Sequence, residues 1–153
     1  MSQHIRARRT AALVGASALI IALAGCSTPS GTGGDPAEAA PGVTDDTVTI
    51  GTHTPLTGPA AAGYSSISAA ATAYFAYLND NGGVHGRSID FIVEDDGYNP
   101  ATTQTVVREL VQQDEIFALL NGLGTPTHTA VLDYLIQNEV PDLFVASGST
   151  SWN

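Results

Sequence analysis

The chain has 153 residues, of which 43% are hydrophobic, with fifteen acidic and five basic side chains. Three of the five basic residues lie within the first ten positions, and the chain has no lysine. The remainder is strongly acidic, which excludes binding to nucleic acid, polyphosphate or anionic lipid through a basic patch.

Residues 1–25 have the pattern of an export signal. A basic start with Arg6, Arg8 and Arg9 precedes an apolar run from Ala11 to Ala24. A bilayer about 30 Å thick needs roughly 20 apolar residues, so this run is too short to span it. A basic stretch, a short apolar stretch and small residues at its end are typical of a signal peptide. The mature protein is therefore expected outside the cytoplasm.

Cys26 is the single cysteine of the chain, so it can form no internal disulfide. Residues 23–26, Leu-Ala-Gly-Cys, resemble the bacterial lipobox, in which the cysteine becomes the acylated first residue of a lipoprotein. Several acyl chains anchor a soluble domain stably, because each buried methylene contributes about 0.8 kcal/mol. We expect Cys26 to be lipidated and residues 26–45, rich in Ser, Gly, Pro and Ala, to form a flexible linker. The alternative is an ordinary cleavage site with a chance cysteine.

From residue 46 onward, strand patterns alternate with helix patterns. The predicted strands are Thr47–Thr52, Ile89–Val93, Phe117–Leu120 and Leu143–Ala146. Apolar stripes predict helices around 67–78, 100–111 and 125–138, with Asn99 and Thr125 as the caps of the second and third. This order predicts an α/β fold with a parallel open sheet flanked by helices on both faces. The chain ends soon after a strand, so we interpret residues 46–153 as an incomplete lobe.

Ligands of open parallel sheets bind beyond the carboxyl ends of the strands. There, residues 121–129, NGLGTPTHT, join a predicted strand to a predicted helix. This loop lacks the third glycine of a dinucleotide motif and any Gly-Lys-Ser/Thr, so no nucleotide is expected. A helix N-terminus with the hydroxyls of Thr125 and Thr127 suits a single carboxylate. The residues alone leave open whether Thr125 holds a ligand or simply caps the helix.

The polar residues at this edge do not predict catalysis or a metal site. Asp95 and Asp96 are adjacent at a strand end, so their side chains point to opposite faces, and we expect them to be solvated. The histidines of the predicted lobe lack metal-ligand spacing, and a surface position is expected for each. They are His53, His85 and His128. Ser147 and Ser149 lack the Gly-x-Ser-x-Gly pattern. We therefore expect no enzymatic activity, no cofactor and no metal.

Five segments, in order, resemble the N-terminal lobe of type I periplasmic-binding proteins. The similarity is greatest to the branched-chain amino-acid, or Leu/Ile/Val, receptors of ABC importers. The segments are VTIGTHTPLTGPAAAG (48–63), LNDNGGVHGR (78–87), EDDGYNP (94–100), NGLGTPTHT (121–129) and VPDLFVASGSTSW (140–152). The resemblance covers residues 46–153 and implies two lobes that close on a small ligand and deliver it to an ABC permease.

The resemblance also implies the ligand-binding residues. Loops after the third and fourth strands hold the ligand's carboxylate and amino groups in this family. Thr125 and Thr150 are expected to offer a hydroxyl and a backbone N–H, and Gly148 a carbonyl. Tyr64 is expected to pack on the ligand side chain. The chain has Gly-Thr-Pro at 124–126 where the family has a serine-rich stretch, a departure from a leucine pocket.

The predicted function is that of a solute-binding lipoprotein for an amino acid or another small carboxylate. The alternative is a ligand-sensing receptor ectodomain of the same fold. The lipobox favours the importer, because a sensor usually carries a transmembrane helix or a signalling domain.

Overall fold

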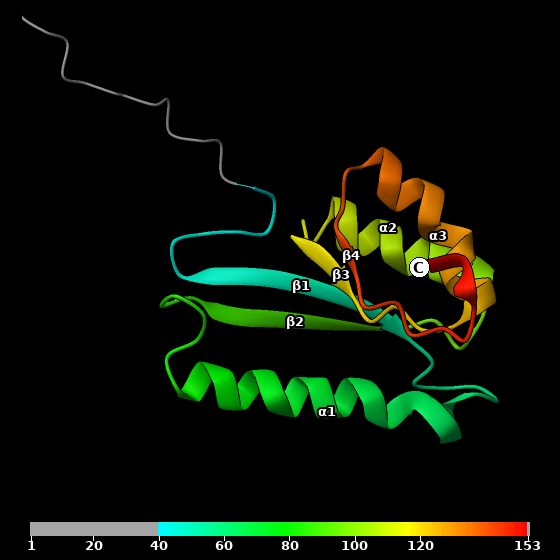
Figure 1. Ribbon diagram of the computed structural model, residues 1–153, viewed down its shortest axis with the longest axis horizontal. Coiled ribbons are helices and arrows are strands. Elements are labelled where there is room, and N and C mark those ends of the chain that lie inside the picture. Colours follow the sequence, from blue (N-terminus) through cyan, green and yellow to red (C-terminus); the bar gives the residue numbers. More distant parts are fainter. Residues whose placement is uncertain (1–39, 153) are drawn as a thin grey trace, which may run out of the picture. The chain divides into compact units, whose positions relative to one another are not determined.

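The computed structural model describes residues 40–152 (Figure 1). The strands are β1 (Thr47–Thr54), β2 (Ser88–Asp95), β3 (Ala118–Leu120) and β4 (Asp142–Leu143). The helices are α1 (Ala61–Asp80), α2 (Pro100–Gln112), α3 (Thr125–Gln137) and the short 3₁₀ helix η1 (Thr150–Trp152). The predicted signal, Cys26 and most of the predicted linker lie outside the described residues. No helix of the described region has the length and apolar character needed to cross a membrane.

The four strands form one parallel sheet in the order β2-β1-β3-β4. β1 pairs with β2 along its whole length, from Thr47 beside Ser88 to Thr54 beside Asp95. Helix α1 covers one face of the sheet, and α2 and α3 cover the other (Figure 1). The predicted α/β fold, a parallel open sheet with helices on both faces, is confirmed.

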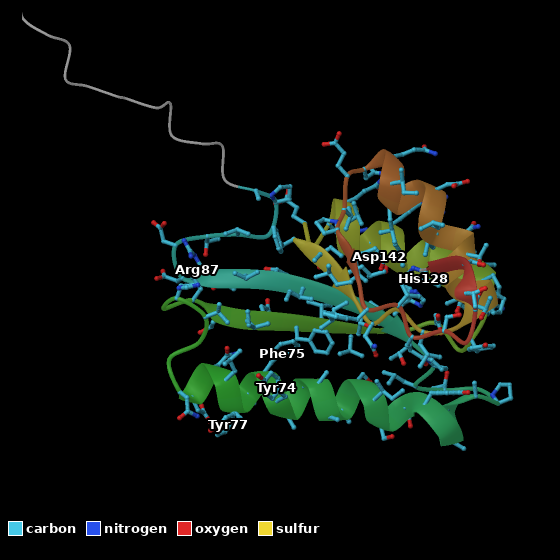
Figure 2. All side chains as sticks on the ribbon, viewed as in Figure 1. Tyr74, Phe75, Tyr77, Arg87, His128 and Asp142 are labelled. Carbon is cyan, nitrogen blue, oxygen red and sulfur yellow. The ribbon has the colours of Figure 1, made fainter. Side chains whose placement is uncertain are left out.

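The main core lies between the sheet and the pair α2 and α3. Its buried members are Val106, Val107, Leu110, Ile116, Leu119, Val131 and Leu135. Gly51 in the central strand permits this packing, since a Cβ there would lie 3.0 Å from the Leu110 side chain. The α1 face is thinner: within α1 only Ser68 is buried. Phe75 packs on Phe91 of β2 with ring centroids 5.0 Å apart, and Figure 2 shows it pointing toward the sheet.

The helix ends confirm one predicted cap and correct another. The Asn99 side chain accepts a hydrogen bond of 2.9 Å from the Ala101 N–H, as expected of a cap. At α3, however, the N-cap is Gly124, with φ of 105°, and no side chain caps the helix. Thr125 is instead the first helical residue. Glycine is itself acceptable at an N-cap, and the positive φ here favours it over threonine.

The fourth strand is shorter than predicted and begins one residue earlier, at Asp142. Phe144 ends it by adopting a φ of +55°, and its side chain is 81% exposed. The chain returns to the sheet edge at Ala146, which forms a parallel bridge with Leu123. An apolar run in the sequence cannot show this left-handed residue, so the expected strand Leu143–Ala146 is wrong in extent.

Residues 40–45, within the predicted linker, lie against the sheet. Val43 forms an antiparallel bridge with Val48, and the Thr49 N–H donates to the Gly42 carbonyl over 2.7 Å. Gly42 has a φ of +69°, and a Cβ there would lie 2.4 Å from the Phe117 backbone nitrogen. The segment that precedes β1 is thus packed closely beside the start of β3.

Candidate functional site

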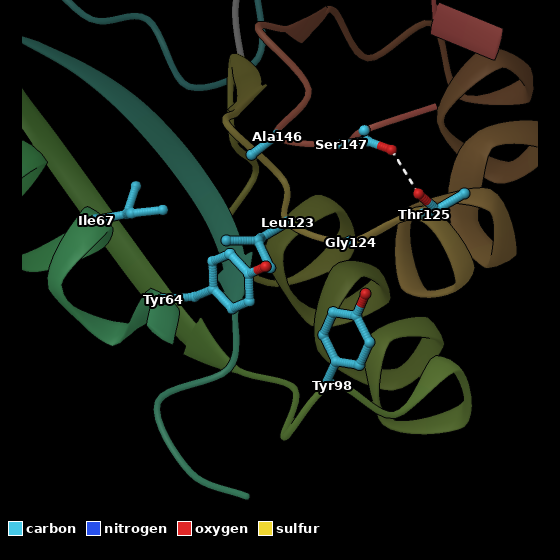
Figure 3. A pocket seen from close by; sticks show the side chains of 9 residues that line it. Tyr64, Ile67, Tyr98, Leu123, Gly124, Thr125, Ala146 and Ser147 are labelled. Carbon is cyan, nitrogen blue, oxygen red and sulfur yellow. Dashed lines mark hydrogen bonds between the residues drawn. The ribbon is translucent and has the colours of Figure 1, made fainter. Parts of the chain in front are cut away.

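A pocket of about 210 Å³ lies at the carboxyl-terminal edge of the sheet (Figure 3). Its walls come from the start of α1, the β2–α2 loop, the β3–α3 loop and the segment after β4. The lining residues are Tyr64, Ile67, Tyr98, Leu123, Gly124, Thr125, Ala146, Ser147 and Gly148. The pocket therefore occupies the edge at which ligands bind in open parallel sheets.

The α1 wall of the pocket consists of Tyr64 and Ile67, one turn apart. Tyr64 is 46% exposed and its ring points into the pocket (Figure 3). Asp95 positions the loop that leads into this helix, because its carboxylate accepts hydrogen bonds from the N–H groups of Leu56 and Thr57, at 2.9 and 3.1 Å. The Thr57 hydroxyl also donates to Asp95 over 2.6 Å. Asp95 was expected to be solvated, but its carboxylate is bonded to the loop and has a structural role.

These contacts determine the protonation of Asp95. Burial raises the pKa of this carboxyl, but the hydrogen bonds from the Thr57 hydroxyl and from the N–H groups of Gly97, Thr57 and Leu56 lower it by more. The net pKa lies below the ordinary value for an aspartate. Asp95 is therefore ionised when it holds the loop. Its neighbour Glu94 behaves in the opposite way, because burial and the charges of Glu109 and Asp114 raise its pKa.

Tyr98 is a pocket residue that sequence reasoning missed. It has a φ of +61°, and its N–H donates to Asp96 Oδ1 over 2.8 Å. Its ring lies against the backbone of Gly124, where an added Cβ would be 2.5 Å from Tyr98 Cε2. Glycine at 124 is thus needed for this contact as well as for its own φ of +105°. The aromatic residue in the loop EDDGYNP is the signal that could have indicated it.

The opposite wall is the N-terminus of α3. No side chain caps this helix, so its first N–H groups have no partner within the helix. The hydroxyls of Thr125 and Ser147 are 2.7 Å apart and join α3 to the segment after β4 (Figure 3). The Thr127 hydroxyl, fully buried, donates to the carbonyls of Leu123 and Gly124. Thr125 is therefore the threonine that faces the pocket.

The structure brings three of the four predicted site residues together. Tyr64, Thr125 and Gly148 all line the pocket. Thr150 does not line it, because it begins η1 beyond the pocket segment. Ser147, the residue directly after the predicted strand, lies beside Thr125 instead. Their roles toward a ligand are considered below as proposals.

His53 and His128 are not surface residues, contrary to expectation; both are fully buried, while His85 is exposed. His53 Nδ1 lies 2.8 Å from Asp96 Oδ2, and His128 Nε2 lies 2.6 Å from Asp142 Oδ2. Asp96 is fully buried, so its expected solvation is wrong too. Figure 2 shows His128 beside Asp142, in the layer between the sheet and α3. The sheet order, which sets β1 next to β3, creates this cluster.

A second and larger cavity, of about 410 Å³, lies at the other end of β3. It is lined by Ala40, Pro41, Val111, Ile116, Phe117, Asn138, Glu139, Val140 and Pro141. Most of these side chains are apolar, and the cavity is at the amino-terminal edge of the strands, away from the loops expected to bind ligand. Among residues 40–152, no group of three or more His, Cys, Asp or Glu side chains is arranged to hold a metal ion. We therefore take the pocket at the carboxyl-terminal edge as the candidate site.

The fold and pocket define a lobe of the periplasmic-binding type, and the comparisons agree. The family model described as "Periplasmic binding protein" matches residues 47–153, so the chain belongs to this family. No curated protein is similar enough in sequence to match.

Several solved structures share this architecture. A fatty acid ABC transporter substrate-binding protein from Thermomonospora curvata is 33% identical, with a TM-score of 0.64 over 73% of this chain and 28% of its own. A possible leucine/isoleucine/valine-binding protein from Rhodopirellula baltica is 25% identical, with a TM-score of 0.65 over 75% of this chain and 30% of its own. A solute-binding protein of an ABC transporter from Rhodopseudomonas palustris, in complex with 3,4-dihydroxybenzoic acid, is 28% identical. Its TM-score is 0.57 over 69% of this chain and 29% of its own. The chain spans less than a third of the length of each.

Proposed function

We propose that this chain provides one lobe of an extracytoplasmic solute-binding lipoprotein of an ABC importer. Its ligand is an amino acid, of the branched-chain type, or a related small carboxylate, bound in the cleft between two lobes. The observation that carries this proposal is the uncapped N-terminus of α3, which lies beside the hydroxyls of Thr125 and Ser147 in the pocket wall. The protein binds and releases this ligand without chemical change and without a cofactor.

The donors in the pocket favour a carboxylate over a phosphate. The two arginines of the described region, Arg87 and Arg108, do not line the pocket, so an anion there is held by neutral donors. Backbone N–H groups at a helix N-terminus and two or three hydroxyls can satisfy one carboxylate. A polyphosphate carries more charge than these donors and an acidic protein can offset. Tyr64 and Tyr98 add two aromatic faces for the rest of the ligand.

The ligands named for similar structures share this chemistry. Fatty acids, leucine, isoleucine, valine and 3,4-dihydroxybenzoic acid differ in their apolar parts, but each has a carboxyl group. A pocket of about 210 Å³ is below the ~300–1,000 Å³ of typical ligand sites, which fits one wall of a cleft closed by a second lobe. The shared group supports the carboxylate as the part of the ligand that this lobe binds.

The test is a binding series on the protein with both lobes, by calorimetry. Leucine, decanoate and 3,4-dihydroxybenzoate are each compared with the matching amide, which keeps the shape and removes the charge. We expect at least one acid to bind, and its amide to bind about ten- to a hundredfold more weakly, because a charge-assisted hydrogen bond is lost. Equal affinity of acid and amide would contradict the carboxylate assignment.

Thr125→Ala is the matching variant, with Thr129→Ala as its control. Thr129 is on the same helix one turn further on, and it is exposed and outside the pocket lining. Thr125→Ala should weaken binding of the acid and leave binding of the amide unchanged. Thr129→Ala should change neither affinity. A loss of the same size for acid and amide would show that Thr125 does not bind the carboxylate.

A further inference from the structure

Two aspartates and two histidines form a continuous chain of hydrogen bonds beneath the pocket. Asp96 Oδ2 is 2.8 Å from His53 Nδ1, His53 Nε2 is 3.2 Å from His128 Nδ1, and His128 Nε2 is 2.6 Å from Asp142 Oδ2. The two imidazole rings are nearly parallel, with centroids 5.5 Å apart. Both rings and Asp96 are fully buried, so water does not substitute for these bonds.

The three hydrogen bonds that link Asp96, His53, His128 and Asp142 require three protons. Each of its three hydrogen bonds contains one proton, and the two carboxylates are acceptors when ionised. Four ring nitrogens therefore share three protons, and the imidazole pair carries a single positive charge between two negative ones. Removal of one proton leaves one of the three bonds without its proton, and the tautomers of the two rings decide which bond is lost. Addition of a fourth directs two N–H groups at each other, so all three bonds exist together in one protonation state only.

The pair lies directly under the loop that makes the pocket wall. A Cβ on Gly122 would be 2.6 Å from both His128 Nδ1 and His53 Nε2, so the backbone of Gly122 rests on the junction between the rings. The next residue, Leu123, donates its N–H to the His53 carbonyl over 3.1 Å. Gly124 and Thr125 follow at once and line the pocket. A change in the distance between the rings must move this loop or break its contact with them.

We propose that His53 and His128 are positioning residues whose shared proton fixes the loop 122–125, so that the pocket wall is correctly placed only when the pair carries one positive charge. Interacting groups of this kind gain and lose protons as a unit. For ligand binding this rests on the proposed function, and it gives an affinity that falls on both sides of a pH optimum. The pH dependence of the loop geometry can therefore be measured on the protein without a ligand.

The surrounding charges favour the single positive charge. Asp96 from the β2–α2 loop and Asp142 from β4 contact the pair directly. Glu94 of β2 pairs in register with His53 of β1. Of the helices packed on this face, α2 carries Arg108 and Glu109 and α3 carries Asp133. Arg108 lies 5.4 Å from the Tyr134 ring centroid. Opposite charges in contact stabilise an imidazolium, and each of the two rings contacts a carboxylate directly.

Nuclear magnetic resonance of the ¹⁵N-labelled protein tests the proton count without a ligand. Imidazole nitrogen shifts of His53 and His128 should show three protonated nitrogens out of four at neutral pH, where the exposed His85 is the internal reference. The amides of Gly122 and Gly124 should shift at the same pH as the pair loses its proton, and not with His85. Two or four protons on the pair at neutral pH, or loop amides that follow His85 or do not move, would overturn the proposal.

Asp142→Asn is the matching variant, because Asp142 is partly exposed and the amide keeps its size. Loss of the facing charge should move the proton loss of the pair, and with it the change in the loop amide signals, to lower pH. Asp133→Asn, the same chemical change at an exposed position of α3, should move neither. If both variants shift the pair equally, or neither does, the contact with Asp142 does not hold the proton. A protein that binds none of the tested acids but passes this test would disprove the proposed function alone.

Discussion

Thr125 and Thr127 lie in the first turn of α3, but their replacement by alanine should have different effects. Thr127→Ala should mainly lower the stability of the fold, and Thr125→Ala should mainly lower the affinity for a ligand. Thr127 is fully buried, and its hydroxyl donates to the carbonyls of Leu123 and Gly124. Thr127→Ala removes this hydrogen bond and a buried methyl group, at a cost of about 1 kcal/mol each, or about 2 kcal/mol in all. For a domain of this size the melting temperature should fall by about 8 °C.

Thr125 is exposed and caps nothing, so its hydroxyl contributes to stability through Ser147 alone in the described contacts. Thr125→Ala should cost about 0.5 kcal/mol and lower the melting temperature by about 2 °C. In the protein with both lobes, however, it should weaken binding of a carboxylate ligand about tenfold or more. Thr127→Ala should leave that affinity nearly unchanged below its melting temperature.

Thermal unfolding followed by circular dichroism measures the first effect, and calorimetry measures the second. Thr127→Val keeps the volume of the side chain, so it separates the hydroxyl from the methyl group and should cost about half as much as alanine. The reasoning is refuted if Thr125→Ala destabilises the fold as much as Thr127→Ala. It is equally refuted if Thr125→Ala leaves ligand affinity intact.

Three further predictions concern the anchor, the lobe and an acid-sensitive contact. Cys26→Ser should release the protein from the membrane or leave its signal uncleaved, and a mutant that is processed and membrane-bound as before would disprove lipidation. Residues 27–153 alone should bind no amino acid tightly, since a cleft ligand has about 70–90% of its surface buried, and a submicromolar Kd by calorimetry would contradict this. The lowered pKa of Asp95 stabilises the fold above the ordinary value of an aspartate, and this contribution is lost as the pH falls through the lowered value. Urea unfolding at pH 7 should therefore show Asp95→Asn to be less stable by about 0.5 kcal/mol, a figure reduced for solvent exposure, with the difference closing in acid.

The strands and helices could be predicted because each depends on local periodicity. β1, β2 and α2 follow alternating or helical apolar patterns, and Asn99 caps α2 through a bond two residues away. The break in β4 could not be predicted, because it depends on a positive φ at Phe144, a conformation that a phenylalanine rarely adopts. The misassigned cap of α3 is a similar case, since both Gly124 and Thr125 are acceptable residues at that position.

The sequence indicated individual pocket residues, but it did not indicate contacts between residues that are far apart along the chain. Thr125 was indicated by the segment 121–129 and Gly148 was implied by the family resemblance, and both line the pocket. The buried pair could not be predicted, because His53 and His128 are 75 positions apart. Their contact requires β3 to pair with β1 and α3 to begin directly beyond it. Neither histidine shows in its own neighbourhood that it will be buried.

The thin packing of α1 has a consequence for local unfolding. A helix in which one residue of twenty is buried gains little from its contacts, so it should open at a lower free energy than α2 or α3. Amide hydrogens of α1 should then exchange with solvent well before those of α3. Tyr64 and Ile67 are part of α1 and should move with it, whereas Thr125 is part of α3, which packs on the main core. We therefore expect the α1 wall of the pocket to yield more easily than the α3 wall, and exchange rates of the two helices would measure the difference.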